Sequence, residues 1–287
     1  MTRTPKSWWV LSGCKRQITT RKETLDYYIP WCSLHRAHII APKECAATLF
    51  SWTLVAIARS INKEVMSSMT YEQLIRDSKE YSKLEPRSIS YDYYLASKDW
   101  QVWLNSSRLP HREVLLLFGF ILSWDRNFKG DIDTFIRQYE KAFPSIRHLS
   151  GHVLWKTDLT DEIMKEIAHT FDLVAKCTTV GHFEGTDASK ILHTILPDLF
   201  VMWDDKIRRG ILGRRAGKDS MTYAFQFVPR MKEEIRLILE SYTTRRHCSA
   251  DIASLRISEA CSGHNLCKLI DESNYVNHTL NNARHVA

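Results

Sequence analysis

Residues 160–177 read TDEIMKEIAHTFDLVAKC and show the clearest helical period in the chain. Their apolar residues return every three or four positions, with Ile163, Ile167 and Phe171 marking the stripe and charged residues on the opposite side. A stripe of this period is typical of an amphipathic helix that packs one face against a core. We therefore expect a helix here, and we use its period to interpret the rest of the sequence.

The same period recurs along most of the chain. Residues 114–124 are apolar on all sides, as expected for a central buried helix. Residues 220–242 continue the pattern, and Pro229 should bend or split that helix because its ring clashes with the preceding turn. Further helices are expected at 45–60, 71–81, 91–104 and 131–142. With only 10 Gly and 8 Pro, the chain lacks the turn residues of a sandwich or barrel, so the sequence predicts an all-α, multi-helix fold.

The helical period is lost around residues 144–158, which suggests a boundary between two helical halves. We expect an irregular N-terminal segment at 1–40, an N-terminal helical half at 41–150 and a C-terminal helical half at 151–287. The C-terminal half contains the segment with the strongest functional signal, described below. We assume a monomer.

Composition is that of an ordinary folded protein. Hydrophobic residues make up 44% and charged residues 25%, which excludes long disorder. The longest apolar stretches fall short of the ~20 residues that a membrane-spanning helix needs, and the N-terminus lacks the apolar run of a secretory signal. We therefore expect no membrane association. The seven cysteines, an odd number, favour reduced thiols in the cytoplasm, or in the nucleus of a eukaryote.

Residues 180–218 carry the functional signal and read VGHFEGTDASKILHTILPDLFVMWDDKIRRGILGRRAGK. We expect a turn with Gly185, a short helix at 187–195 capped by Thr186, an extended link ending at Trp203, and a second helix beginning at Asp204. Free backbone amides at the start of the second helix would suit a phosphate. The segment thus predicts a helix-hairpin-helix element.

This layout resembles the helix-hairpin-helix superfamily of base-excision DNA glycosylases. In that family a Gly-rich hairpin docks on DNA, and a Pro- and Val-rich link delivers an aspartate to the mouth of the base pocket. The resemblance places the hairpin at Gly185 and Thr186 and the acid at Asp204, 18 positions after Thr186. It covers residues 180–218 only, with one of the two turn glycines in register and without the four-cysteine cluster of some members.

The resemblance implies cleavage of the N-glycosidic bond of a damaged or mismatched base. Asp204 would stabilise positive charge on the sugar and orient water, although an aspartate at a helix start is often only a cap. Asp205 competes for this role, and the sequence does not separate the two. Lys190 is a candidate Schiff-base nucleophile for an additional lyase activity, a phosphate contact, or a solvated side chain. Thr186 stands where bifunctional members carry lysine, which suits a monofunctional enzyme.

The resemblance implies DNA as the partner. The formal net charge of +7 points towards a polyanion in general, because cations that neutralise phosphates release counterions. The expected backbone contacts combine the hairpin with a basic run: Gly185, Thr186, Lys206, Arg208, Arg209, Arg214, Arg215 and Lys218. A solvated basic loop is the alternative interpretation. A flipped base needs aromatic stacking, for which Trp203 is the best candidate, with Phe183 and Trp124, although buried core positions would explain these rings equally well.

Two further matters stay open. Cys248, Cys261, His264 and Cys267 have zinc-compatible types and spacing, but they are equally typical of buried cysteines in helices, and we expect neither a metal nor a cofactor. A non-catalytic nucleic-acid-binding protein and a helical protein–protein adaptor are the alternative functions. Loss of base release would identify an enzyme, and loss of salt-dependent binding a nucleic-acid-binding surface.

Overall fold

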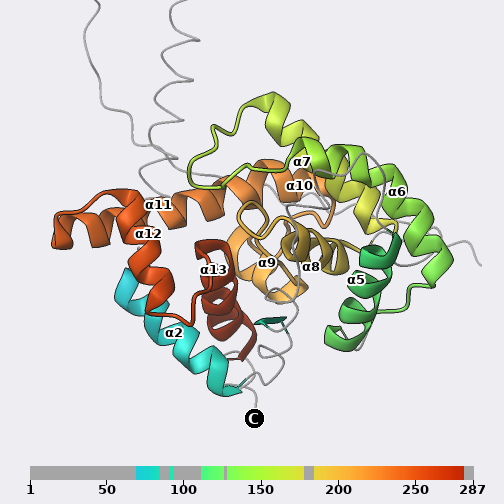
Figure 1. The fold of residues 1–287 in the computed structure, drawn as a ribbon. Helices are drawn as coiled ribbons and strands as arrows, with labels where there is room; N and C mark the ends of the chain where they lie inside the picture. Colours follow the sequence, from blue (N-terminus) through green and yellow to red (C-terminus); the bar gives the residue numbers. More distant parts are fainter. Residues whose placement is uncertain (1–68, 85–90, 93–110, 126–127, 178–183, 281–287) are drawn as a thin grey trace, which may run out of the picture. The chain divides into compact units, whose positions relative to one another are not determined.

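The computed structural model describes residues 69–84, 91–92, 111–125, 128–177 and 184–280. These residues form helices joined by turns, with no strand among them (Figure 1). All of them belong to one compact unit, Glu64–Ala287. The all-α fold class is therefore confirmed. The helix expected at 45–60, most of that at 91–104, and Phe183 lie outside the described residues.

The elements are α2 (Tyr71–Leu84), α5 (His111–Trp124), α6 (Ile132–His148), α7 (Asp161–Ala175), α8 (Gly185–Ile195), α9 (Asp205–Leu212), α10 (Ser220–Thr222), the π-helical η1 (Tyr223–Phe227), α11 (Val228–Arg246), α12 (Ala250–Glu259), α13 (Leu266–Asn274) and the π-helical η2 (Tyr275–Leu280). Six of the described helices begin where a short polar side chain accepts a backbone amide of the first turn: Asp131, Thr160, Asp204, Asp219, Ser249 and Asn265. Such caps satisfy amides that the helix itself leaves unpaired.

Two prolines show how the helices accommodate a missing amide. Pro144 lies inside α6, which continues to His148, so the helix expected to end near residue 142 is longer than predicted. Pro229 stands in the first turn of α11, directly after the π-helical turn η1, and Phe227 and Val228 keep right-handed helical backbone angles. The winding changes from π to α just before Pro229 while the backbone stays helical, and the expected bend or split at Pro229 stays a prediction.

An aromatic cluster joins α7, the link between α8 and α9, and η1. The rings of Phe171 and Tyr223 stack with centroids 4.1 Å apart, and Trp203 meets Tyr223 edge-on at 5.0 Å. Phe200 and Phe227 complete the cluster, and all five side chains are buried. The link that leads to Asp204 is thus fixed by the core and is not a free loop.

Helix α13 is the most enclosed element of the described chain. It packs against α2, α11 and α12 and continues into η2 (Figure 1). Every residue from Leu266 to Asn274 is buried, including Lys268, Asp271 and Glu272. Its charged side chains must therefore find partners inside the protein. Separately, no helix in the described segments has both the length and the apolar character required to cross a bilayer.

Candidate active site

One cavity gathers several of the residues singled out in the sequence. Its volume is about 90 Å³, and it is lined by Tyr81, Trp124, Lys190, Met202, Trp203, Asp204, Ile207, Asp271 and Tyr275. These side chains come from α2, α5, α8, the link, α9, α13 and η2. Asp204, Lys190, Trp124 and Trp203 therefore share one site. Asp205, the competing carboxylate, is not among the lining residues.

Asp204 is held from two sides. Its Oδ1 accepts the backbone amides of Lys206 and Ile207, both at 2.7 Å, so it caps α9 as predicted. Its Oδ2 accepts the hydroxyl of Thr279 from η2 at 3.2 Å. A Cβ at Gly210 would overlap the ring of His278, so this glycine lets η2 lie close enough to α9 for the Thr279 contact.

Two local expectations for the hairpin are wrong. Helix α8 begins at Gly185, so Thr186 lies in its first turn and does not cap it; Glu184 holds the cap position without a side-chain bond. The amides at the start of α9 are not free for a phosphate, because Asp204 already accepts two of them. A carboxylate inside the protein fills the position that an anion from solution would take.

Lys190 belongs to a small charged cluster beside the cavity. Its ammonium forms an ion pair with the buried carboxylate of Asp125. Burial, together with a hydrogen bond to Asp125 and the charge of Asp125, raises the pKa of Asp187 to about 7, while Lys190 opposes that shift. An ammonium in an ion pair has no lone pair to attack a sugar, so this arrangement favours Lys190 as a positive charge over Lys190 as a nucleophile.

The two tryptophans in the cavity wall also belong to the core. The indole N–H of Trp203 donates to the carbonyl of Gly185 at 3.2 Å, which ties the link to the first turn of α8. Trp124 packs against Tyr91 and Phe120. Each ring is buried and each lines the cavity, so both are core residues, and their stacking against a base stays a prediction.

Arg208 is structural rather than an exposed phosphate contact. Its side chain is buried, and its guanidinium donates to the carbonyls of Ala216 and Gly217 and to Asp205. Arg208, Lys218 and Arg209 surround Asp205, and the hydrogen bond from Arg208 is the main reason that the pKa of Asp205 is lowered. Asp205 therefore organises the basic segment and lies apart from the cavity.

The remaining cations of the segment are available at the surface. Lys206, Arg209, Arg214, Arg215 and Lys218 are exposed. Within the described part of the chain, no carboxylate forms an ion pair with Lys206, Arg214 or Arg215. Lys206, Arg214 and Arg215 can therefore contact a polyanion without first breaking an ion pair.

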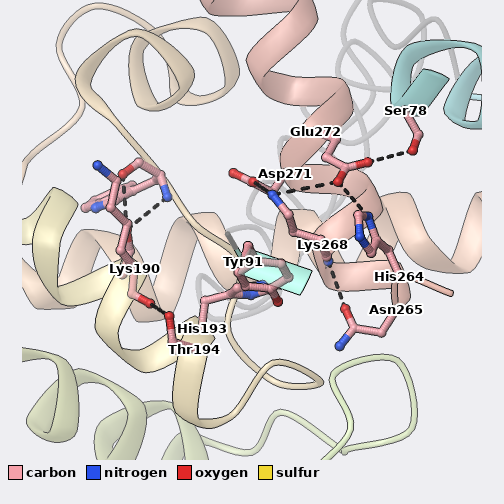
Figure 2. A network of polar contacts seen from close by, with 12 residues as sticks. Ser78, Tyr91, Lys190, His193, Thr194, His264, Asn265, Lys268, Asp271 and Glu272 are labelled. Carbon is pink, nitrogen blue, oxygen red and sulfur yellow. Dashed lines mark hydrogen bonds and ion pairs between the residues drawn. The ribbon is translucent and has the colours of Figure 1, made fainter. Parts of the chain in front are cut away.

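Asp271, one of the lining residues, belongs to a buried ionic network that the sequence did not indicate. Lys268 is 1% exposed; its Nζ lies 3.0 Å from Asp271 Oδ2 and 3.8 Å from Glu272 Oε1 (Figure 2). The ammonium also lies 4.7 Å from the ring centroid of Tyr81 and 5.0 Å from that of Tyr91. Burial lowers the pKa of Lys268, but these tyrosines and carboxylates outweigh burial, and the net shift is upward.

The network extends through two histidines. His264 Nδ1 lies 2.7 Å from Glu272 Oε1, poorly aligned for a hydrogen bond, and its Nε2 lies 2.5 Å from Asp92 Oδ1. Burial lowers the pKa of His264, but the neighbouring Glu272 and Asp92 outweigh burial, and the net shift of the pKa is upward. His193 is enclosed, and burial lowers its pKa to about 3. Neutral His193 therefore donates from Nδ1 to a carbonyl and accepts the hydroxyl of Tyr91 at Nε2.

The candidate zinc ligands Cys248, Cys261, His264 and Cys267 are not gathered into one group among the described residues. The thiol of Cys267 donates to a backbone carbonyl at 3.2 Å, and burial raises the pKa of both Cys267 and Cys261. His264 faces carboxylates on both ring nitrogens, as described above. No group of three metal-binding side chains occurs in the described ranges, which include Cys248. Cys261 and Cys267 are buried and Cys248 is half-buried, and only Cys267 lies in a helix, α13.

No family model, curated protein or solved structure matches the chain. The signal that could have indicated Asp271 is the sequence pattern of α13, where Asp271 and Glu272 follow Lys268 at the helical spacings of three and four residues.

Proposed function

We propose that the chain is a DNA glycosylase of the helix-hairpin-helix type, with Asp204 as the essential carboxylate. The observation that carries the proposal is the cavity: Asp204, Lys190, Trp124 and Trp203, separated by up to 80 residues in the sequence, line the same small space. Cleavage of an N-glycosidic bond needs a fixed carboxylate beside an aromatic pocket, and this combination supplies both.

Asp204 would act on the sugar. As the bond between the sugar and the base breaks, positive charge develops at the anomeric carbon, and a carboxylate fixed by three donors stabilises that charge without having to reorganise. The same carboxylate would orient the attacking water and take its proton. The ion pair between Lys190 and Asp125 favours hydrolysis by water over attack by Lys190.

DNA binding would use the exposed cations that follow the acid. Lys206, Arg214 and Arg215 lie on α9 and the loop after it, next in sequence to the residues of the cavity wall. Contacts to phosphates from this surface would orient the duplex, and the cavity would receive the base.

The cavity must open before a base can enter. A volume of about 90 Å³ is well below that of an engineered cavity of about 150 Å³ that binds benzene. This favours one specific alternative, a non-catalytic nucleic-acid-binding protein that uses the same basic surface. Under that alternative, duplex binding persists and no abasic site forms.

The decisive experiment compares Asp204→Asn with Asp205→Asn. Asparagine also caps helices, so Asp204→Asn should keep α9 intact while it removes the charge. Both variants and the parent are incubated with duplexes that contain uracil, hypoxanthine, oxidised guanine or alkylated adenine, followed by alkali to reveal abasic sites. Borohydride trapping is run in parallel to detect a covalent lysine adduct.

We expect Asp204→Asn to lose base release by about 10²- to 10³-fold, the range for a removed electrostatic contact, with no trapped adduct in the parent. Asp205→Asn is the matched control: it removes a neighbouring carboxylate that does not line the cavity, and its activity should stay close to that of the parent. Full activity of Asp204→Asn, or no base release by the parent from any duplex, would refute the proposal.

A further inference from the structure

Asp271 is a second carboxyl group in the cavity that holds Asp204. It lies on α13, whereas Asp204 ends the link before α9, so the two acids approach the same space from different parts of the chain. Figure 2 shows the Asp271 carboxyl on the side of α13 that faces the helix of Lys190. The two carboxyl groups thus stand in one site that also contains aromatic rings.

The two oxygens of Asp271 have different surroundings. Oδ2 accepts a hydrogen bond from the ammonium of Lys268 at 3.0 Å. Among the described residues, no hydrogen bond to Oδ1 is present, and this atom is not among the fully buried unpaired ones. The Lys268 contact therefore fixes the carboxyl group and leaves one oxygen available to a molecule in the cavity.

The surroundings of Asp271 also distinguish it chemically from Asp204. Burial is the largest influence and raises the pKa of Asp271 to about 6; Lys268 opposes the shift, and the charges of Glu272 and Asp204 add to it. Asp204 instead accepts two backbone amides at Oδ1 and the hydroxyl of Thr279 at Oδ2. Two carboxyl groups with such different environments are the arrangement that divides acid and base roles in glycosidic cleavage.

We infer that Asp271 is a catalytic acid that protonates the leaving base while Asp204 stabilises the sugar, an assignment that rests on the proposed glycosylase function. The proton would pass from Asp271 to the base as the glycosidic bond breaks, with the bonding electron pair leaving on the base. Water then bonds to the anomeric carbon and gives a proton to Asp204. Exchange with solvent returns both carboxyl groups to their starting states, so that one water is consumed for each base released.

The need for an acid identifies the substrate class. A purine carries N7, a ring nitrogen with an acceptor lone pair that is not part of the glycosidic bond. Protonation there removes the negative charge that would otherwise build up on the leaving base. The inference therefore favours purine lesions, and hypoxanthine is a suitable probe because its 7-deaza form replaces this nitrogen with a carbon.

The test compares Asp271→Asn with Glu234→Gln in single-turnover base release from hypoxanthine and 7-deazahypoxanthine duplexes. Glu234 is the matched control, because it is a largely buried carboxyl group whose pKa burial also raises, to about 7, but it pairs with Arg230 and does not line the cavity. On hypoxanthine, the parent rate should fall as the pH rises through about 6, and Asp271→Asn should be slower by about 10²-fold or more, with a flat pH profile. On the 7-deaza substrate, Asp271→Asn and the parent should have the same rate, and Glu234→Gln should match the parent on both.

Three results would overturn the inference: an unchanged hypoxanthine rate in Asp271→Asn, equal slowing on both substrates, or the same slowing in Glu234→Gln. These failures are distinct from failure of the proposed function, which is signalled by no base release in the parent or by full activity of Asp204→Asn. If Asp271→Asn does not fold, the double variant Lys268→Met/Asp271→Asn removes both buried charges together and undergoes the same comparison.

Discussion

Replacement of Lys268 by methionine should strongly destabilise the protein. The ammonium is 1% exposed and lies 3.0 Å from Asp271 and 3.8 Å from Glu272. Methionine has a similar length but leaves both buried carboxylates without their cation. Breaking a buried ion pair from one side costs about 3–5 kcal/mol. At about 2–4 °C per kcal/mol for a folded unit of this size, the melting temperature should fall by about 6–20 °C.

The destabilisation should depend on pH in a defined direction. Loss of Lys268 removes the charge that opposes burial, so the pKa of Asp271 rises further above its unfolded value, which is near 4. When the folded pKa exceeds the unfolded one, the folded state holds the proton more tightly, and stability falls as the pH rises through the folded value. The deficit of Lys268→Met should therefore be larger at about pH 7.5 than at about pH 5.

Thermal unfolding followed by tryptophan fluorescence measures this deficit, since Trp124 and Trp203 report on the core around the cavity. Lys156→Met is the matched control, because Lys156 pairs with Asp251 at the surface, where removal of an ion pair costs less than about 1 kcal/mol. If Lys268→Met unfolds within about 1 °C of the parent at both pH values, the buried ionic network does not stabilise the fold and our account of α13 is wrong.

Two further changes test the surroundings of Asp204 and the basic surface. Gly210→Ala should displace His278 and η2 and slow base release, whereas Gly119→Ala, at an open helical position, should leave the rate unchanged; equal rates for both would contradict the packing argument. Arg214→Gln/Arg215→Gln should reduce the slope of log affinity for duplex DNA against log salt by about 2, as measured by fluorescence anisotropy. An unchanged slope would show that this surface does not contact phosphates.

The parts of the fold that sequence predicted are those set by local chemistry. Helical period identified α7, and the residue types around Asp204 indicated a helix that starts there, because capping involves only the next three residues. The same local preferences wrongly predicted that Thr186 caps α8. Threonine is a good cap, but α8 starts at Gly185 and uses no capping side chain. Local preference gives a candidate position, and packing decides which candidate is used.

Composition could not predict which arginines of the basic segment are buried and which are exposed. Arg208 and Arg209 are adjacent and chemically identical, yet one is buried and bonded to Ala216 and Gly217 while the other is exposed. The difference arises because α9 turns by about 100° per residue, so neighbours face different sides. Only the path of the loop after α9, which brings its carbonyls back to Arg208, determines which arginine remains for a phosphate.

The sequence did not predict that Asp271 lines the cavity, and the reason lies in the packing of α13. A short helix with Lys268, Asp271 and Glu272 is normally amphipathic, with its charges in water. Here every residue of the helix is buried, because α2, α11 and α12 surround it, and the charges compensate one another across one turn instead of meeting solvent. The order of apolar and charged residues in a helix does not show which other element packs against its charged face. Only the folded chain brings α2 against α13. In this packing, Asp271 of α13 lines the same cavity as Asp204.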